Sequence, residues 1–280
     1  MSRIVHLNGQ YLPEQEAKVS IFDRGYVFGD GVYEVTAVVD GKLVDYEPHM
    51  ERLERSLREL QLAWPCSKEA LREMHEELAR RNKLTEGVIY MQVTRGVAER
   101  EFSFPKDVPS SIMAFTQQKT IIDNPKAETG VKVITFPDIR WKRRDIKSIA
   151  LLPQCLGKQR AVEAGAFEGW MVEDGAVTEG TSSTAYIVMG NSVFTRPLSN
   201  AVLPGVTRKS LMKLATEHNI TIEERPFSVE EAQGADEAFL TSASTFVMPI
   251  VEIDGKTVGT GRPGEITRKL RTIYIEAARG

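Results

Sequence analysis

Cysteine and histidine are scarce in this sequence. It contains two cysteines, Cys66 and Cys155, and four histidines in 280 residues. The two cysteines have the spacing of neither a metal site nor a redox pair, and they are too few for a disulfide framework. The histidines are scattered without the spacing of a zinc site. The sequence therefore predicts neither a metal site nor a disulfide-stabilised scaffold.

Long hydrophobic runs and an excess of one charge are also missing. No segment approaches the roughly 20 apolar residues that cross a membrane, and the beginning, MSRIVHLNGQYLPEQ, does not resemble a signal peptide. The 36 basic and 39 acidic side chains are well mixed, without the basic runs typical of nucleic-acid binders. We expect a cytoplasmic protein that binds neither membranes nor nucleic acid.

The composition is that of a globular protein with more than one core. Hydrophobic residues make up 41% and charged residues 27%, an ordinary balance. A chain of this length usually forms two domains. The segment 117–130 is polar and contains Asp123-Asn124-Pro125, which is typical of a connection. We expect an N-terminal domain over 1–120, a linker over 121–130, and a C-terminal domain over 131–280.

Helices and strands alternate without a regular βαβ rhythm. Asn8-Gly9 predicts a hairpin within 4–12, and the β-branched run 32–39 predicts a strand. Apolar spacing predicts helices over 48–62 and 68–82, the second with Ser67 as N-cap. Further helices are expected over 149–164, 207–217 and from Glu265, among strands that include 131–136, 169–173, 185–189 and 220–224. The fold class is therefore α+β, with two domains.

Lys147 is the first candidate for chemistry. A single lysine is most often a solvated surface group. This one follows Lys142-Arg143-Arg144 and precedes the apolar run 149–152. Neighbouring cations and partial burial both lower the pKa of an ammonium group, as a Schiff-base lysine requires.

Three further segments carry groups suited to an anionic ligand, each with a plain structural alternative. Gly205-Val206-Thr207 opens a predicted helix, where backbone N–H groups favour a phosphate, although such a threonine commonly caps a helix. Thr241-Ser242-Ala243-Ser244-Thr245 is a cluster of small donors that would also suit an ordinary loop. Glu179 lies among hydroxyl residues, either as a solvated turn residue or as a partner for a pyridine nitrogen.

Taken together and in order, six segments resemble the fold-type IV pyridoxal-phosphate transferases, and the resemblance covers essentially the whole chain. The segments are Asp23-Arg24-Gly25-Tyr26 with 28–34, His49-Met50-Glu51-Arg52-Leu53, Asp138-Ile139-Arg140-Trp141 with 145–148, Thr178-Glu179-Gly180, Gly205-Val206-Thr207-Arg208, and Thr241-Ser242. The lysine segment is most similar to that of D-amino-acid aminotransferases. The family also contains branched-chain aminotransferases and aminodeoxychorismate lyases.

The resemblance implies a two-domain fold-type IV transferase fold and pyridoxal 5'-phosphate as cofactor. It implies that Lys147 is the Schiff-base lysine and general base, and that Glu179 pairs with the pyridine nitrogen. The phosphate contacts that it implies are Arg52, Val206, Thr207, Ser242 and Ala243. It also implies a homodimer, since the family shares active-site residues across a two-fold interface.

The implied reaction is transamination between a D-amino acid, such as D-alanine, and a 2-oxo acid, either pyruvate or 2-oxoglutarate. Tyr33 and Arg100 match the family's carboxylate contacts, but Phe102 stands where D-amino-acid aminotransferases have histidine, and Thr184 where well-known members have asparagine. The first departure puts the substrate range in question. The alternatives are a transaminase for (R)-amines or branched-chain L-amino acids, and an aminodeoxychorismate lyase.

Overall fold

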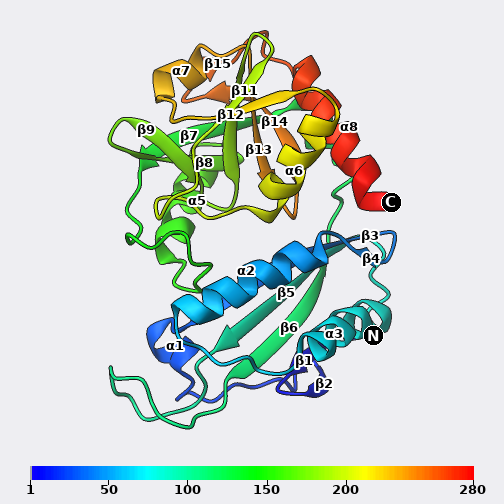
Figure 1. Cartoon of the computed structure of the whole chain (residues 1–280), viewed down its shortest axis with the longest axis vertical. Coiled ribbons are helices and arrows are strands. Elements are labelled where there is room, and N and C mark those ends of the chain that lie inside the picture. Colours follow the sequence, from blue (N-terminus) through cyan, green and yellow to red (C-terminus); the bar gives the residue numbers. More distant parts are fainter. Residues whose placement is uncertain (1) are drawn as a thin grey trace. The chain divides into compact units, whose positions relative to one another are not determined.

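The computed structural model describes residues 2–280 and divides into two compact units (Figure 1). Unit 1 comprises the chain up to Thr120 together with Ile146–Ala150, and unit 2 comprises Ile121–Asp145 together with Leu151–Gly280. Within residues 2–280, no helix is both long and apolar enough to span a membrane.

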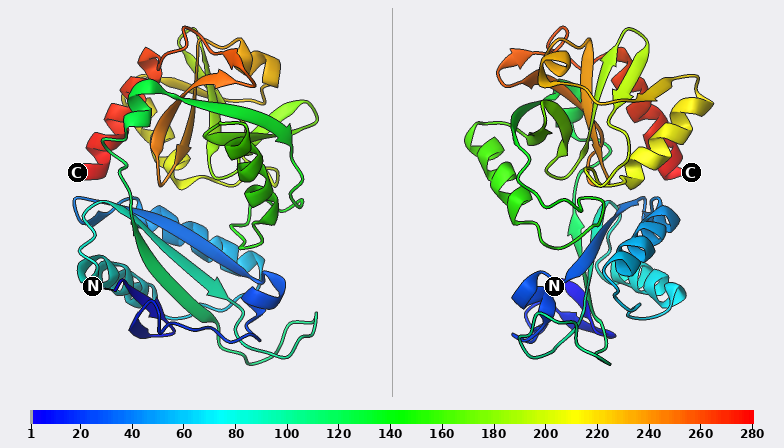
Figure 2. Two further views of the ribbon diagram at one scale, coloured as in Figure 1. Left: turned by 180° about the vertical axis from the view of Figure 1, so that it is seen from behind. Right: turned by 60° about the vertical axis from the view of Figure 1, so that its left-hand side comes forward.

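Unit 1 is an antiparallel sheet with helices on one face. The sheet order is β2-β1-β6-β5-β3-β4. The strands are β1 (Ile4–Leu7), β2 (Gln10–Pro13), β3 (Gly31–Val39), β4 (Lys42–Leu43), β5 (Gly87–Thr94) and β6 (Ser111–Gln118). The helices are α1 (Arg24–Phe28), α2 (Tyr46–Glu59) and α3 (Lys68–Arg81). In Figure 2 (left) the sheet faces the viewer and α2 lies behind it.

The core of unit 1 forms between this sheet and the two longer helices. Leu53 and Leu57 of α2 and Leu71 and Leu78 of α3 are almost wholly buried, together with Met91 of β5. Leu53 and Leu57 are four residues apart, and Leu71 and Leu78 are seven residues apart, spacings that keep each pair on one helix face, so each helix buries one apolar stripe. Side chains alternate between the faces of β3, which places every second residue toward α2.

Unit 2 contains a larger mixed sheet that curls back on itself. Its order is β12-β11-β10-β13-β14-β7-β8-β9, with β15 paired to β14, and the last strand, β9, also contacts β10. The strands are β7 (Val131–Pro137), β8 (Glu168–Glu173), β9 (Ala176–Gly180), β10 (Thr184–Met189), β11 (Ser192–Thr195), β12 (Thr221–Glu224), β13 (Glu237–Ser242), β14 (Phe246–Ile253) and β15 (Lys256–Thr257).

Helices pack on this sheet along its length. They are α4 (Pro125–Thr129), α5 (Leu152–Glu163), α6 (Val206–Glu217), α7 (Val229–Gln233) and α8 (Glu265–Arg279). Helix α5 packs on β7 and β8, whereas α6 and α8 contact each other and β13. The buried side chains of Trp170, Ile187, Leu240 and Met248 belong to the core of this unit.

The α+β class and most of the expected elements agree with the structure, but the expected linker does not. Residues 121–130 contain α4 and belong to unit 2. Ile121 is fully buried, and Arg271 of α8 donates hydrogen bonds to the carbonyl oxygens of Ile121 and Ile122 at 2.6 and 2.8 Å. The polar composition of 121–130 suggested an exposed connection. The sequence does not show that this segment packs, because Arg271, which binds its carbonyl groups, lies about 150 residues away.

Three further differences from the sequence-based expectations concern Lys147 and two helices. The lysine was assigned to the C-terminal domain, whereas Lys147 lies in the short stretch that packs with unit 1. The helix expected over 149–164 begins only at Leu152, because residues 147–149 bind the backbone of β3 through an isolated bridge instead. Helix α1 was not expected at all. It is a single short turn capped by the side chain of Asp23, too short to show an apolar period.

Close packing of α5 on the sheet generates a test of this fold. A Cβ atom on Gly157 would come within 2.1 Å of the Phe136 ring, and one on Gly169 within 2.4 Å. Alanine in a helix normally gains about 1 kcal/mol over glycine. Gly157→Ala is instead expected to lower the free energy of unfolding by roughly 1–3 kcal/mol, because the ring cannot move aside in a packed core.

Thermal or urea unfolding measures this change. The matched control is the same substitution in a Phe136→Leu background, where the smaller side chain should remove most of the cost. A stabilised Gly157→Ala protein would contradict the close contact between α5 and Phe136.

Candidate active site

Lys147 is held beside the first half of β3. The backbone N–H of Tyr33 donates to the carbonyl of Lys147 at 3.0 Å, and that of Ile149 donates to the carbonyl of Gly31 at 3.1 Å. Ser148 forms a β-bridge with Val32. The Lys147 Nζ lies 4.1 Å from the centroid of the Tyr33 ring. Backbone hydrogen bonds on both sides of Lys147 therefore fix its position, and an aromatic ring contacts its amine.

The cations before Lys147 are not the unbalanced positive cluster expected from the sequence. Lys142 and Arg144 both pair with Glu173, and Arg143 pairs with Asp145. Each positive charge therefore has a carboxylate beside it. The expectation of an unbalanced positive charge beside Lys147 is therefore wrong. The local sequence does not reveal it, because Glu173 lies 29 residues after Arg144.

Arg52 belongs to a buried charged cluster under β3. Its Nε and Nη2 donate to the two carboxylate oxygens of Glu34 at 2.9 and 2.7 Å, and His49 Nδ1 lies 2.8 Å from the same carboxylate. Burial alone would raise the pKa of Glu34, but the Arg52 guanidinium and these hydrogen bonds lower it to about 2. Glu34 is therefore an anion that fixes the plane of the Arg52 guanidinium.

Arg100 and Phe102 lie on an exposed loop of unit 1, beside the ring of Phe28. The Arg100 Cζ lies 5.5 Å from the Phe28 ring centroid and 5.6 Å from that of Phe102, and the two rings are 5.6 Å apart. Within residues 2–280, Arg100 makes no other side-chain hydrogen bond or ion pair. These ring contacts use none of the N–H donors of the guanidinium, which therefore suit a carboxylate.

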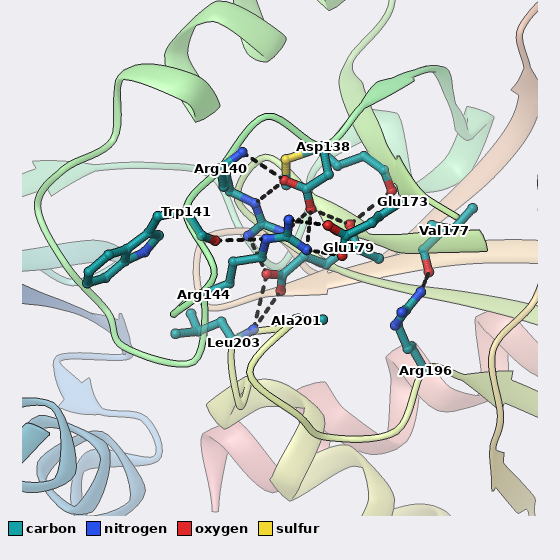
Figure 3. A network of polar contacts seen from close by, with 12 residues as sticks. Asp138, Arg140, Trp141, Arg144, Glu173, Val177, Glu179, Arg196, Ala201 and Leu203 are labelled. Atoms are coloured by element: carbon teal, nitrogen blue, oxygen red, sulfur yellow. Dashed lines mark hydrogen bonds and ion pairs between the residues drawn. The ribbon is translucent and has the colours of Figure 1, made fainter. Parts of the chain in front are cut away.

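Glu179 lies on β9 in unit 2, and its carboxylate is buried and held from two sides (Figure 3). Arg140 Nη1 pairs with its Oε1, and the backbone N–H of Leu203 lies 3.1 and 3.2 Å from its two oxygens. Burial raises the pKa of Glu179, and Arg140 opposes that shift. A solvated turn residue would show none of these features, so that reading of Glu179 is wrong.

The two expected phosphate-binding segments lie close together in unit 2. Helix α6 begins at Val206, and no side chain caps it, with Gly205 at the N-cap position. A Cβ on Gly205 would approach the Thr184 hydroxyl to 2.8 Å, and Thr184 is paired with Thr241 across β10 and β13. Thr184 therefore lies between the start of α6 and the turn after β13.

That turn carries a cluster of hydroxyl groups. Ser242 Oγ lies 2.8 Å from the Thr245 hydroxyl and 3.3 Å from that of Ser244. Together with the uncapped first turn of α6, these donors suit a phosphate. Unit 2 thus brings together Glu179, the start of α6 and the turn with Ser242 and Ala243, while Tyr33, Arg52, Lys147, Arg100 and Phe102 lie in unit 1.

The sequence analysis did not assign roles to Glu34 and Arg140, the residues that hold Arg52 and Glu179 in place. Glu34 has a weak signal, because it is an acid at a core-facing position of an otherwise apolar strand. Arg140 was seen only as part of a segment, without a role, and nothing near it in the sequence indicates Glu179 as its partner.

Comparisons with known proteins agree with the family that the six segments resemble. The family model described as class IV amino-transferase matches residues 31–253. D-alanine aminotransferase of Staphylococcus aureus is 43% identical over 98% of this chain and 98% of its own. The one from Bacillus licheniformis is 39% identical over 96% and 94%. The solved branched-chain amino acid aminotransferase of Escherichia coli superimposes with a TM-score of 0.91 at 23% identity, covering 99% of this chain and 95% of that chain.

The Glu34–Arg52 pair generates a test with a defined pH dependence. Glu34→Gln is expected to lower the free energy of unfolding by roughly 3–5 kcal/mol near neutral pH, because it leaves a buried guanidinium without its carboxylate. Folding lowers the pKa of Glu34 from 4.5 to about 2. The stabilisation is therefore complete above the unfolded-state pKa and is lost as pH falls toward the folded-state value.

Urea unfolding at neutral pH and at several acidic values measures this difference, which should narrow as pH falls. Glu54→Gln is the control, since the Glu54–Lys68 pair is exposed and should contribute less than about 1 kcal/mol. A difference that stays constant across this range would show that the pair does not stabilise the fold by its charge.

Proposed function

The chain belongs to the class IV aminotransferases, which are pyridoxal-phosphate enzymes, and we propose that it transfers an amino group between a D-amino acid, such as D-alanine, and a 2-oxo acid. Pyruvate and 2-oxoglutarate are the proposed acceptors. The near-full-length identity of 43% to a D-alanine aminotransferase carries this proposal. The likeness to the Escherichia coli branched-chain enzyme, at 23% identity, shows the fold alone.

The residues of unit 2 suit the cofactor. We propose that the backbone N–H of Val206 and Ala243 and the hydroxyls of Thr207 and Ser242 hold its phosphate. Gly205 supports this, because a larger residue there would crowd Thr184 at the start of α6. A neighbouring anion also balances the positive end of a helix dipole.

The charged residues are assigned distinct roles. When bound, pyridoxal phosphate supplies a ring that accepts the electron pair left when the substrate Cα proton departs. Lys147 is proposed to tether the cofactor and then, as a free amine, to remove that proton. With the cofactor bound, Glu179 would accept a hydrogen bond from its ring nitrogen, and Arg52, which is oriented by Glu34, would contribute positive charge to its phosphate.

Substrate recognition is proposed to depend on Tyr33 and Arg100. A guanidinium binds a carboxylate through two parallel N–H donors, and the rings of Phe28 and Phe102 lie beside Arg100 as its aromatic contacts. Phe102 then replaces the polar contact of a histidine with a contact that orients the arginine.

A homodimer working in the cytoplasm is part of the proposal. Several large apolar side chains of unit 1 are exposed, among them Ile21 at 70%, Tyr26 at 75% and Phe102 at 76%. Such a group of exposed apolar residues is typical of an interaction surface. We propose that a second copy of the chain covers it and receives Arg100 from its neighbour.

Lys147 is expected to carry the cofactor. Borohydride reduction of the purified holoenzyme should fix the cofactor mass on the peptide that contains Lys147, and Lys147→Ala should lose nearly all transamination. The nearby Lys142, paired with Glu173 on the surface, provides the control, because Lys142→Ala should keep both label and activity. Label on another lysine would overturn the assignment.

Substrate choice is tested with D-alanine, L-leucine and (R)-1-phenylethylamine, each paired with pyruvate and with 2-oxoglutarate. D-alanine is expected to be the best donor. Arg100→Ala should reduce kcat/KM for D-alanine by at least about tenfold, since a charged hydrogen bond contributes roughly 1.5–3 kcal/mol, while largely sparing the amine. Phe102→His should improve D-alanine use.

Each outcome of this panel has a distinct meaning. A clear preference for L-leucine would favour the branched-chain alternative, and pyruvate release from aminodeoxychorismate without any amino acceptor would favour the lyase. Unchanged D-alanine kinetics in Arg100→Ala would show that another group holds the carboxylate.

A further inference from the structure

Arg140 bridges two buried carboxylates in unit 2. Its Nη1 pairs with Glu179, while its Nε and Nη2 donate to the two oxygens of Asp138 at 3.0 and 2.7 Å. The side chains of Arg140, Glu179 and Asp138 are only 5%, 7% and 0% exposed. All three guanidinium nitrogens are therefore used inside the protein, as Figure 3 shows.

The bridge continues into a ladder of alternating charge. Arg144 Nη1 lies 3.4 Å from Asp138, and Arg144 also pairs with Glu173 at 2.6 Å. Asp138 accepts a further hydrogen bond from the Thr178 hydroxyl at 2.8 Å. These contacts fasten the loop after β7 to strands β8 and β9, so Arg140 cannot turn away from Glu179 without breaking several bonds.

The charge on Glu179 depends on this arrangement. Burial raises its pKa, and the nearby negative charge of Asp138 acts in the same direction, whereas Arg140 and the Leu203 N–H lower it. Of the other charged groups on the packed elements, Arg144 and Glu173 pair with each other, and Arg196 donates to the Val177 carbonyl instead. Arg140 is thus the cation that directly contacts Glu179 in this unit.

The state of Glu179 matters for the reaction. A carboxylate stabilises a proton on the ring nitrogen, and a protonated ring withdraws electrons more strongly than a neutral one. A neutral carboxylic acid has lost that charge. With both carboxylates ionised, the trio of Asp138, Arg140 and Glu179 carries one net negative charge, so contact with one arginine does not by itself cancel the charge available to a ring nitrogen.

We propose that Arg140 is a positioning residue that keeps Glu179 ionised and fixes the direction of its carboxylate, with Asp138 locking the arginine in place. The inference rests on the proposed function, in which Glu179 faces the ring nitrogen. Arg140 would act on the reaction only through Glu179, without contacting substrate or cofactor itself.

The test uses three variants of the cofactor-loaded enzyme. Arg140→Met removes the positive charge at similar side-chain length, and Arg140→Lys keeps the charge but cannot bind both carboxylates. Arg144→Met is the control, because Arg144 belongs to the same charged network but does not contact Glu179. The ionisation of Glu179 is followed by carbon-13 NMR of labelled glutamate carboxyl groups against pH, with Glu179→Gln identifying the signal. Single-turnover rates with D-alanine are measured over the same range.

In the parent enzyme the Glu179 signal should be that of a carboxylate near neutral pH. In Arg140→Met it should titrate at a higher pH. The single-turnover rate should fall by about tenfold for each pH unit below that new pKa, with little change in KM, and should recover as pH rises. Arg140→Lys should restore most of the rate, and Arg144→Met should lose stability but keep the parent pH profile.

Three results would overturn the inference. They are an unchanged Glu179 titration in Arg140→Met, a rate loss in that variant that does not recover with pH, and an equal effect of Arg144→Met. If Arg140→Met fails to fold, Arg140→Gln takes its place, and an unchanged Glu179 titration in that variant would equally overturn the inference. Failure of the proposed function would appear differently, as no turnover of D-alanine in the parent enzyme, while the NMR titration still reports on Arg140.

Discussion

A buried carboxylate must have a cation and hydrogen-bond donors beside it, and this constraint organises both units. In unit 1 the carboxylate is Glu34, which is paired with Arg52. In unit 2 it is Glu179, which is paired with Arg140. An isolated charge at either position would cost several kcal/mol. Each acid therefore determines where an arginine lies, and each arginine comes from a different element of its unit.

The two ion pairs shift the pKa of their carboxylates in opposite directions. Fork-like hydrogen bonds from Arg52 reach both oxygens of Glu34, and the pKa of that acid falls to about 2. Glu179 receives one guanidinium nitrogen and a backbone N–H, and its pKa remains raised. The difference follows from Asp138, which takes the rest of the Arg140 fork. A raised pKa in a buried group is a common feature of functional sites.

The departure at Phe102 is also intelligible in physical terms. A histidine would contribute a polar contact to a bound carboxylate, whereas Phe102 and Phe28 contribute ring faces to Arg100. These ring contacts use none of the N–H donors of the arginine. If Arg100 holds the substrate carboxylate as proposed, the loop around it is the place where the substrate range of this chain is expected to differ from that of its relatives.

Much of the fold was accessible from sequence alone. The hairpin at Asn8-Gly9 and the helices α2 and α3 follow local rules of turn geometry, capping and apolar spacing, which act within a few residues. The family was accessible for a similar reason, since its motifs, including the one around Lys147, are short and contiguous. These parts of the molecule were determined by the sequence itself.

Only the tertiary structure decided which charges pair and which stretches pack together. Residues 121–130 have a polar composition and yet pack into unit 2, because Arg271 donates to the Ile121 carbonyl. The cations before Lys147 turned out to be neutralised by Glu173 and Asp145. Arg140 and Glu179 are 39 positions apart, in a chain where 27% of residues are charged. Long-range ion pairs leave no local pattern, because any of many acids could satisfy a given arginine until the sheet brings one of them beside it.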